Sequence, residues 1–338
     1  MTKVYKRYNL IIQLGIFVIS YFFIINQVFW KQDLPSLVQT LIKDFSSSRF
    51  LWTLVVLLFL MVFNWLLEAL KWRFLISKVE DVSFGRSVMA VLTGVTISSF
   101  TPNRIGEFFG RAFVLKKASH VEGILITIIG SMSQLLITII TGSLAFLVFL
   151  PVFMPDAKFF TGYLYYALVA VVLLSNVLLL GLFVNVSFLS TFKEKILKNG
   201  ISKIRKYFRV FTLYTNRELW IIMGLSLLRY AVFSTQYLLL LWAFDVNFPF
   251  YIGYLLIALI YFIMAVIPTI ALTELGIRGS VAIYCFGFYF AAMAPAMATL
   301  NLGILMASVL IWVINLGIPA VAGSVFLFRL QFFRNNEA

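Results

Sequence analysis

The chain has 338 residues, of which 62% are hydrophobic and 12% charged, and its mean hydropathy is +1.01. Soluble domains contain about 45–50% apolar and about 25% charged residues, so this composition excludes a soluble protein and indicates a polytopic membrane protein. The net charge of +14 is explained by short basic loops on the cytoplasmic side, and nucleic acid is not expected as a partner.

Six apolar segments are long enough to cross a bilayer, which takes about 20 helical residues. They are 10–30, 50–70, 122–150, 160–186, 219–244 and 298–328. Two further segments, 87–115 and 250–293, are interrupted by Pro102 and Pro268. We therefore predict an all-α fold with about 7–8 transmembrane helices and two re-entrant hairpins, in a single membrane domain over residues 1–338.

Basic residues predict the orientation of the chain. The N-terminus, the segment 71–86, the pair Lys116–Lys117 and the basic loop 191–218 are all assigned to the cytoplasmic side. Both ends of segment 87–115 then lie on one side, as in a hairpin that enters and returns. Basic clusters also attract anionic headgroups, which is an alternative reading. We expect an integral protein of the plasma membrane, of the bacterial inner-membrane type, with a cytoplasmic N-terminus.

An internal repeat is suggested by two similar intervals, Phe84 to Pro102 and Phe250 to Pro268, each of 18 residues (102 − 84 and 268 − 250). We predict a first half, 1–150, with hairpin 84–116, and a second half, 160–338, with hairpin 249–280. Three crossings separate the hairpins, so the repeat is predicted to be inverted. Paired Gly/Pro-interrupted segments are typical of transporter sites near the middle of the membrane.

The first hairpin carries Arg104, Glu107 and Arg111 around Gly106. Charged side chains at membrane depth are costly and are candidates for a functional site. On a helix these three would share one face. They form either a mutually neutralised cluster or a site with surplus positive charge, whose guanidinium groups suit phosphate.

The second hairpin carries Glu274 and Arg278 around Gly276. These two form either a local salt bridge at spacing i, i+4 or a face that meets the first hairpin and completes a polar cavity. Pro102, Gly106, Pro268 and Gly276 are the predicted structural hinge positions.

Other polar residues lie inside predicted helices. Arg229 is deep in segment 219–244 and needs a partner or a cavity, with Gln236 seven residues later on the same face. Glu68, Glu107 and Glu274 are the candidate counter-charges, although Glu68 is favoured as a local ion pair with Lys71 at the inner membrane interface.

Several chemistries are not expected. Cys285 is the single cysteine and His120 the single histidine, too few for a disulfide or for a zinc or haem site of the usual kind. No Asp-x-Asp motif is present. We expect no cofactor, no metal and no catalytic residues, and we do not predict an enzyme.

The motif Thr101-Pro102-Asn103-Arg104-Ile105-Gly106-Glu107 resembles the T-P-x-R-x-G-E pattern of the lysylphosphatidylglycerol synthase transmembrane-region family, also called flippase-like domain proteins. The segment from Pro268 to Arg278 resembles the family's second motif, but Thr273-Glu274 replaces a paired glycine and Gly279 a common acid. Residues 131–134 also lack the E-R-x-x-D pattern of many members. The resemblance implies a lipid transporter, and the chain is similar to a stand-alone member without the soluble synthase domain.

We therefore predict a flippase that moves an anionic or phosphate-bearing lipid, such as an anionic phospholipid or a polyprenyl phosphate, through a polar cavity. The predicted substrate-binding residues are Arg104, Glu107, Arg111, Arg229, Gln236, Glu274 and Arg278. The alternatives are a membrane-embedded transferase acting on a lipid-linked substrate and a non-catalytic envelope scaffold. The transport direction, the energy source, the side of the C-terminus and a homo-oligomeric state are left open.

Overall fold

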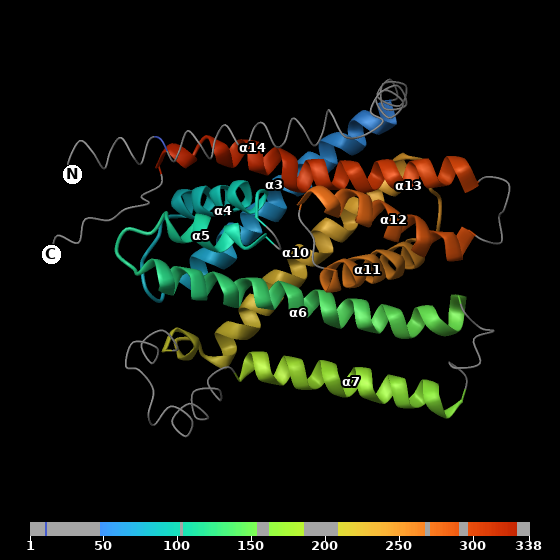
Figure 1. Cartoon of the computed structure of the whole chain (residues 1–338), viewed down its shortest axis with the longest axis horizontal. Helices are drawn as coiled ribbons and strands as arrows, with labels where there is room; N and C mark the ends of the chain where they lie inside the picture. Colours follow the sequence, from blue (N-terminus) through green and yellow to red (C-terminus); the bar gives the residue numbers. More distant parts are fainter. Residues whose placement is uncertain are drawn as a thin grey trace. The chain divides into compact units, whose positions relative to one another are not determined.

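The computed structural model describes residues 11, 48–101, 104–153, 162–185, 209–267, 271–290 and 297–329 (Figure 1). Every regular element in these ranges is a helix. In chain order they are α3 (Ser48–Ile76), α4 (Phe84–Ser98), α5 (Gly106–Ala112), α6 (His120–Phe153), α7 (Tyr163–Val184), η4 (Arg209–Thr212), α10 (Asn216–Ala243), α11 (Phe250–Val266), α12 (Ala271–Phe290), α13 (Met297–Trp312), η6 (Val313–Gly317), α14 (Ile318–Ser324) and η7 (Leu327–Arg329). The predicted all-α fold is confirmed.

Among the described residues, five helical segments are long and apolar enough to cross a membrane: α3, α6, α7, α10 and the continuous stretch Gly303–Ser324. The apolar helices α4 and α11 are shorter, with 15 and 17 residues. At 1.5 Å per residue α4 covers only about 22 Å of a hydrocarbon core of about 30 Å. The protein is thus an all-α polytopic membrane protein.

Some sequence predictions fall outside the described ranges or stay untested. Segment 10–30 lies outside them except for residue 11, and only 209–218 of the basic loop 191–218 is described. Helices α4 and α11 begin at Phe84 and Phe250, where the two similar intervals start. The number of crossings beyond those described, the re-entry of the hairpins, the halves 1–150 and 160–338 and their inverted relation remain predictions.

The chain forms two compact units, which we describe separately. The described part of unit 1 comprises 11, 48–101, 104–128, 271–274 and 312–329. The described part of unit 2 comprises 129–153, 162–185, 209–267, 275–290 and 297–311. The first turn of α12 therefore belongs to unit 1, and the rest of that helix to unit 2.

Unit 1 is built on an antiparallel hairpin of α4 and α5 (Figure 1). Its two helices approach backbone to backbone, because a Cβ atom on Gly110 would lie 2.7 Å from the Cα atom of Gly94. Helix α14 also contacts α4 backbone to backbone, since a Cβ atom on Gly323 would lie 2.1 Å from the Leu92 carbonyl oxygen. The Thr96 hydroxyl donates to the Ala320 carbonyl at 2.8 Å and links the same two helices.

A carboxylate joins the two loops at one end of this hairpin. Glu80, between α3 and α4, accepts hydrogen bonds from the backbone N–H groups of Lys116, Lys117 and Ala118 at 2.6–3.1 Å and from Arg86 at 2.8 Å. Burial alone raises the pKa of Glu80, but these donors outweigh it and bring the pKa down to about 2. The ionised form therefore stabilises the fold.

Unit 2 is held by small and polar side chains between long apolar helices. Ser133 on α6 and Ser226 on α10 share a 2.7 Å hydrogen bond, and the amide of Asn176 on α7 donates to Ser143 on α6 at 2.9 Å. Such polar contacts between helices are common where lipid supplies no hydrophobic force for association.

We expect Gly323→Ala to lower the free energy of unfolding by about 1–3 kcal/mol, because the new methyl group would overlap the Leu92 carbonyl oxygen. Gly181→Ala is the matched control, because no atom lies within 4 Å of its added Cβ and alanine favours helix. Thermal unfolding in detergent should show a lower midpoint for the first variant alone. Equal midpoints would contradict the close α4–α14 contact.

Glu80→Gln should lower stability at pH 7 by on the order of 3 kcal/mol. The folded-state pKa of Glu80 is depressed from 4.5 to about 2, so the wild-type advantage is present above pH 4.5 and disappears as the pH falls towards 2. Denaturation at a series of pH values measures the difference. Asp81→Asn, at the exposed neighbouring position, should leave the wild-type pH profile intact.

Candidate functional site

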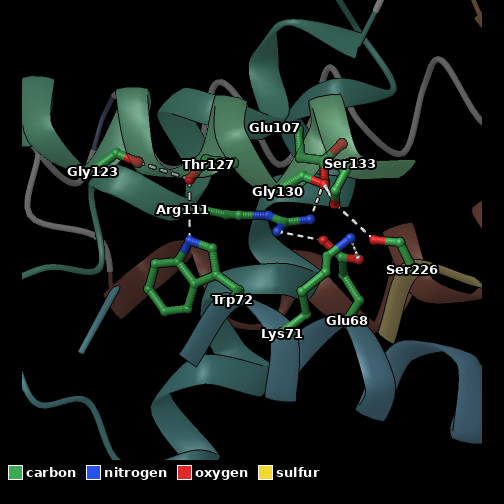
Figure 2. A network of polar contacts seen from close by, with 10 residues as sticks. All are labelled: Glu68, Lys71, Trp72, Glu107, Arg111, Gly123, Thr127, Gly130, Ser133 and Ser226. Carbon is green, nitrogen blue, oxygen red and sulfur yellow. Dashed lines mark hydrogen bonds and ion pairs between the residues drawn. The ribbon is translucent and has the colours of Figure 1, made fainter. Parts of the chain in front are cut away.

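Four charged side chains meet in the interior of unit 1 (Figure 2). Arg111 on α5 donates through Nη1 to Glu68 Oε1 at 2.8 Å and through Nη2 to Glu107. Lys71 Nζ lies 2.8 Å from Glu68 Oε2. Arg111, Glu68 and Lys71 side chains are each at most 3% exposed, whereas Glu107 is 22% exposed. We call these four residues the buried cluster; its two cations and two carboxylates carry no net charge.

The local sequence explains how this cluster forms. Glu68 and Lys71 lie one turn apart on α3, and Glu107 and Arg111 lie one turn apart on α5, so each pair shares a helix face. Gly94 on α4 makes room for Arg111, because a Cβ atom there would lie 3.0 Å from Arg111 Cγ. Beside the cluster, Trp72 Nε1 donates to Thr127 Oγ1 at 3.1 Å and ties α3 to the start of α6 (Figure 2).

Arg104 lies in the turn before α5 and not in the helix. Its φ of +57° is in the left-handed region, which is uncommon for a residue with a side chain and costs about 1–2 kcal/mol. Thr101 holds this turn: its carbonyl accepts from the Arg104 N–H at 3.2 Å and its hydroxyl accepts from the Gly106 N–H at 2.7 Å. Gly106 is required here, since a Cβ atom would lie 2.6 Å from the Ile97 carbonyl oxygen.

The guanidinium of Arg104 meets the first turn of α12. Its Nη2 atom lies 3.0 Å from both carboxylate oxygens of Glu274. The Arg104 side chain is 44% exposed, and that of Glu274 only 7%. Glu274 engages a single nitrogen of the guanidinium, whereas the group offers five N–H donors. Arg104 of the first motif and Glu274 of the second thus come together within unit 1.

These contacts correct two expectations. Arg104 does not share a helix face with Glu107 and Arg111, because α5 begins at Gly106 and the left-handed turn carries Arg104 away from that helix. The surplus positive charge expected from two arginines and one glutamate is balanced by acids from other segments, Glu68 and Glu274.

The predicted Glu68–Lys71 ion pair is confirmed at 2.8 Å, but it is buried and shares Glu68 with Arg111. Lys71 was therefore missed as a member of the embedded site. Its place three residues after Glu68 was the signal that could have found it.

The other predicted site residues belong to unit 2. Arg229 and Gln236 lie on α10, and Gln236 is fully buried. Arg278 on α12 lies over the Tyr261 ring of α11, 5.8 Å from the ring centroid, a cation–π contact. Of the predicted hinges, Pro102 and Pro268 lie outside the described residues, and Gly276 is an exposed residue within α12 with open space around it. In the described ranges no group of three His, Cys, Asp or Glu side chains could hold a metal ion.

Comparison with known families decides the relationship. A model described as the lysylphosphatidylglycerol synthase TM region matches residues 10–280. The chain belongs to this family. The match to the family includes the buried cluster and the Arg104–Glu274 pair, and with the helical fold it makes this an integral membrane protein related to lipid handling. No match was found among curated proteins or solved structures.

Arg111→Met should lower the free energy of unfolding by about 3–5 kcal/mol, because Lys71 alone would then face the carboxylates of Glu68 and Glu107. Adding Glu107→Gln restores neutrality and should recover part of the loss. Arg104→Gln should cost less than Arg111→Met, because the Arg104 guanidinium is 44% exposed and solvent screens its attraction to the buried Glu274 carboxylate. Thermal unfolding in detergent tests this order; equal losses at positions 104 and 111 would contradict the distinction between the two arginines.

Proposed function

We propose that the protein moves an anionic, phosphate-bearing lipid between the two leaflets, and that Arg104 binds the headgroup phosphate. The observation that carries this proposal is the state of the Arg104 guanidinium: it is nearly half exposed, and among the described residues it is held through one nitrogen. A guanidinium matches the geometry of phosphate oxygens, with two N–H groups aimed at two acceptors.

The charge distribution favours Arg104 over Arg111 for this role. Arg111 is 2% exposed and pairs with two carboxylates in the neutral buried cluster, so a headgroup would have to break buried ion pairs to reach it. Arg111, Glu68 and Lys71 instead fix the helix that follows Arg104. The substrate-binding roles predicted for Arg229, Gln236 and Arg278, which belong to unit 2, stay predictions.

Glu274 has two roles in this proposal. With no lipid bound, it holds the guanidinium in place and balances its charge at a depth where an isolated charge is costly. When a phosphate binds Arg104, it competes with Glu274 for the same cation. In the loaded state Arg104 therefore pairs with the lipid phosphate, and in the empty state it pairs with Glu274. Glu107, the more exposed acid of the buried cluster, is a second carboxylate that can change its ion-pair partner between these states. The acyl chains remain in the bilayer throughout.

The test is lipid transfer in reconstituted liposomes with a fluorescent anionic phospholipid and, separately, a polyprenyl phosphate. Arg104→Gln should reduce the transfer rate by about tenfold or more, which corresponds to the loss of one charge-assisted hydrogen bond of at least about 1.4 kcal/mol. Arg104→Lys keeps the charge without the planar guanidinium, so its transfer rate should lie between those of wild type and Arg104→Gln. Arg49→Gln, at an exposed arginine in the first turn of α3, is the matched control and should behave as wild type.

Glu274→Gln supplies an independent readout, because removing the competing carboxylate should tighten binding of the anionic lipid while slowing release. Mass spectrometry of lipid that co-purifies with this variant identifies the headgroup. Equal transfer by wild type and Arg104→Gln, at matched expression, would contradict the proposal. Absence of transfer of any anionic lipid by the wild type would favour a transferase or scaffold instead.

A further inference from the structure

The last membrane-length helical stretch of the described residues, Gly303–Ser324, contains a π-helical turn. Helix α13 ends at Trp312, η6 covers Val313–Gly317 and α14 follows at once. The hydrogen bond from the Ile318 N–H to the Val313 carbonyl runs from i+5 to i and defines the turn. Among the described residues η6 is the one π-helical element. Such turns are rare, carry one residue more than an α-helical turn, and occur frequently at functional sites.

The sequence explains why the α-helix is interrupted at this point. In an α-helix the Asn315 carbonyl would accept a hydrogen bond from the N–H of residue 319. Residue 319 is proline, which has no N–H and whose ring crowds that carbonyl. Pro319 therefore disfavours the α-helical register at this point, and replacing the proline should favour that register.

A side-chain contact connects this turn to α3, the helix that carries Glu68 and Lys71 of the buried cluster. Asn64 on α3 donates through Nδ2 to Asn315 Oδ1 at 3.2 Å, and Asn64 lies one helical turn before Glu68. Asn64 is 2% exposed, and its Oδ1 atom has no hydrogen-bond partner within the described ranges. A buried amide that is only half satisfied costs free energy, as expected for a contact that exchanges partners between two states.

On its other side the turn leads into α14, which is fastened to the hairpin. Thr96 bonds to the Ala320 carbonyl at 2.8 Å, and Gly323 allows the backbone contact with Leu92. Contacts of this closeness transmit displacement, because neither helix has an intervening side chain that could absorb it. A change of one residue in the register of η6 would therefore move α14 and α4 together.

We propose that η6 is an adjustable joint that positions the α4–α5 hairpin during transport, and that Asn315 is its positioning residue, coupled through Asn64 to the buried cluster. This inference rests on the proposed transport function. In one state η6 is π-helical, as observed; in the other it returns to an α-helical register, shifting the hairpin that carries Arg104. Pro319 keeps the π-helical state of η6 accessible.

The experiment compares Pro319→Ala with Pro151→Ala, a proline inside α6 that is preceded by regular α-helix and not by a π-helical turn. Pro319→Ala supplies the missing N–H and should favour the α-helical register. We expect its maximal transfer rate for the fluorescent anionic phospholipid to fall about tenfold, with an unchanged half-saturating lipid concentration and an unchanged or higher melting temperature. Amide hydrogen exchange over residues 313–324 should slow. Pro151→Ala should show none of these changes.

Asn64→Leu, Asn315→Leu and the double variant test the coupling. If the two amides act as one contact, the double variant should be no slower than the slower single variant, and Asn315→Gln should recover part of the rate. A normal transfer rate in Pro319→Ala would overturn the proposal that η6 is an adjustable joint. A reduced transfer rate that is accompanied by a lower melting temperature would overturn it too. If Arg104→Gln transfers normally, the transport proposal itself fails, whereas a defective Arg104→Gln beside a normal Pro319→Ala rejects the joint alone.

Discussion

The Arg111 side chain is only 2% exposed, so its charge must be balanced by neighbouring side chains. Glu107 comes from the same helix, but Glu68 comes from α3, and Glu68 in turn requires Lys71. This requirement sets the distance between α3 and α5 and the face that each presents. Gly94 on α4 completes the arrangement by leaving room for the arginine stem. Electrostatic balance and backbone packing are thus satisfied by the same few positions.

Two arginines seven residues apart take different roles because of their backbones. Arg111 lies on a regular helix and faces inwards, whereas Arg104 lies in a left-handed turn organised by Thr101. Strain of this kind persists only where the surroundings enforce it, and it is frequent at ligand sites. The turn presents Arg104 to Glu274, whose helix starts at the second motif. The pattern T-P-x-R-x-G-E can thus be read in part as backbone chemistry: threonine closes the turn and glycine permits close packing.

Much of this organisation could be predicted from the sequence, because membrane helices are marked by composition and length. Helices α4 and α11 begin at Phe84 and Phe250, the residues at which the two similar intervals start, and the embedded charges were recognised by their cost. The partners of those charges could not be predicted in the same way. Glu68 and Arg111 are 43 residues apart, and Arg104 and Glu274 are 170 apart, so no helical spacing reports their contact. The π-helical turn also escaped prediction: Pro319 signals a disturbed helix, but whether the result is a kink or an extra residue depends on tertiary contacts such as Asn64–Asn315.

The neutrality of the ion pairs in unit 1 has a consequence for the membrane potential. The buried cluster and the Arg104–Glu274 pair together hold three positive and three negative side chains. A voltage across the membrane exerts no net force on such a set when it shifts as a body. If the protein moves a lipid as proposed, the work done by the field, about 2.3 kcal/mol per elementary charge for each 100 mV, falls on the charge of the lipid itself. Transport of a singly charged headgroup by this arrangement would be electrogenic, with a direction preferred by the voltage and a sign set by the cargo.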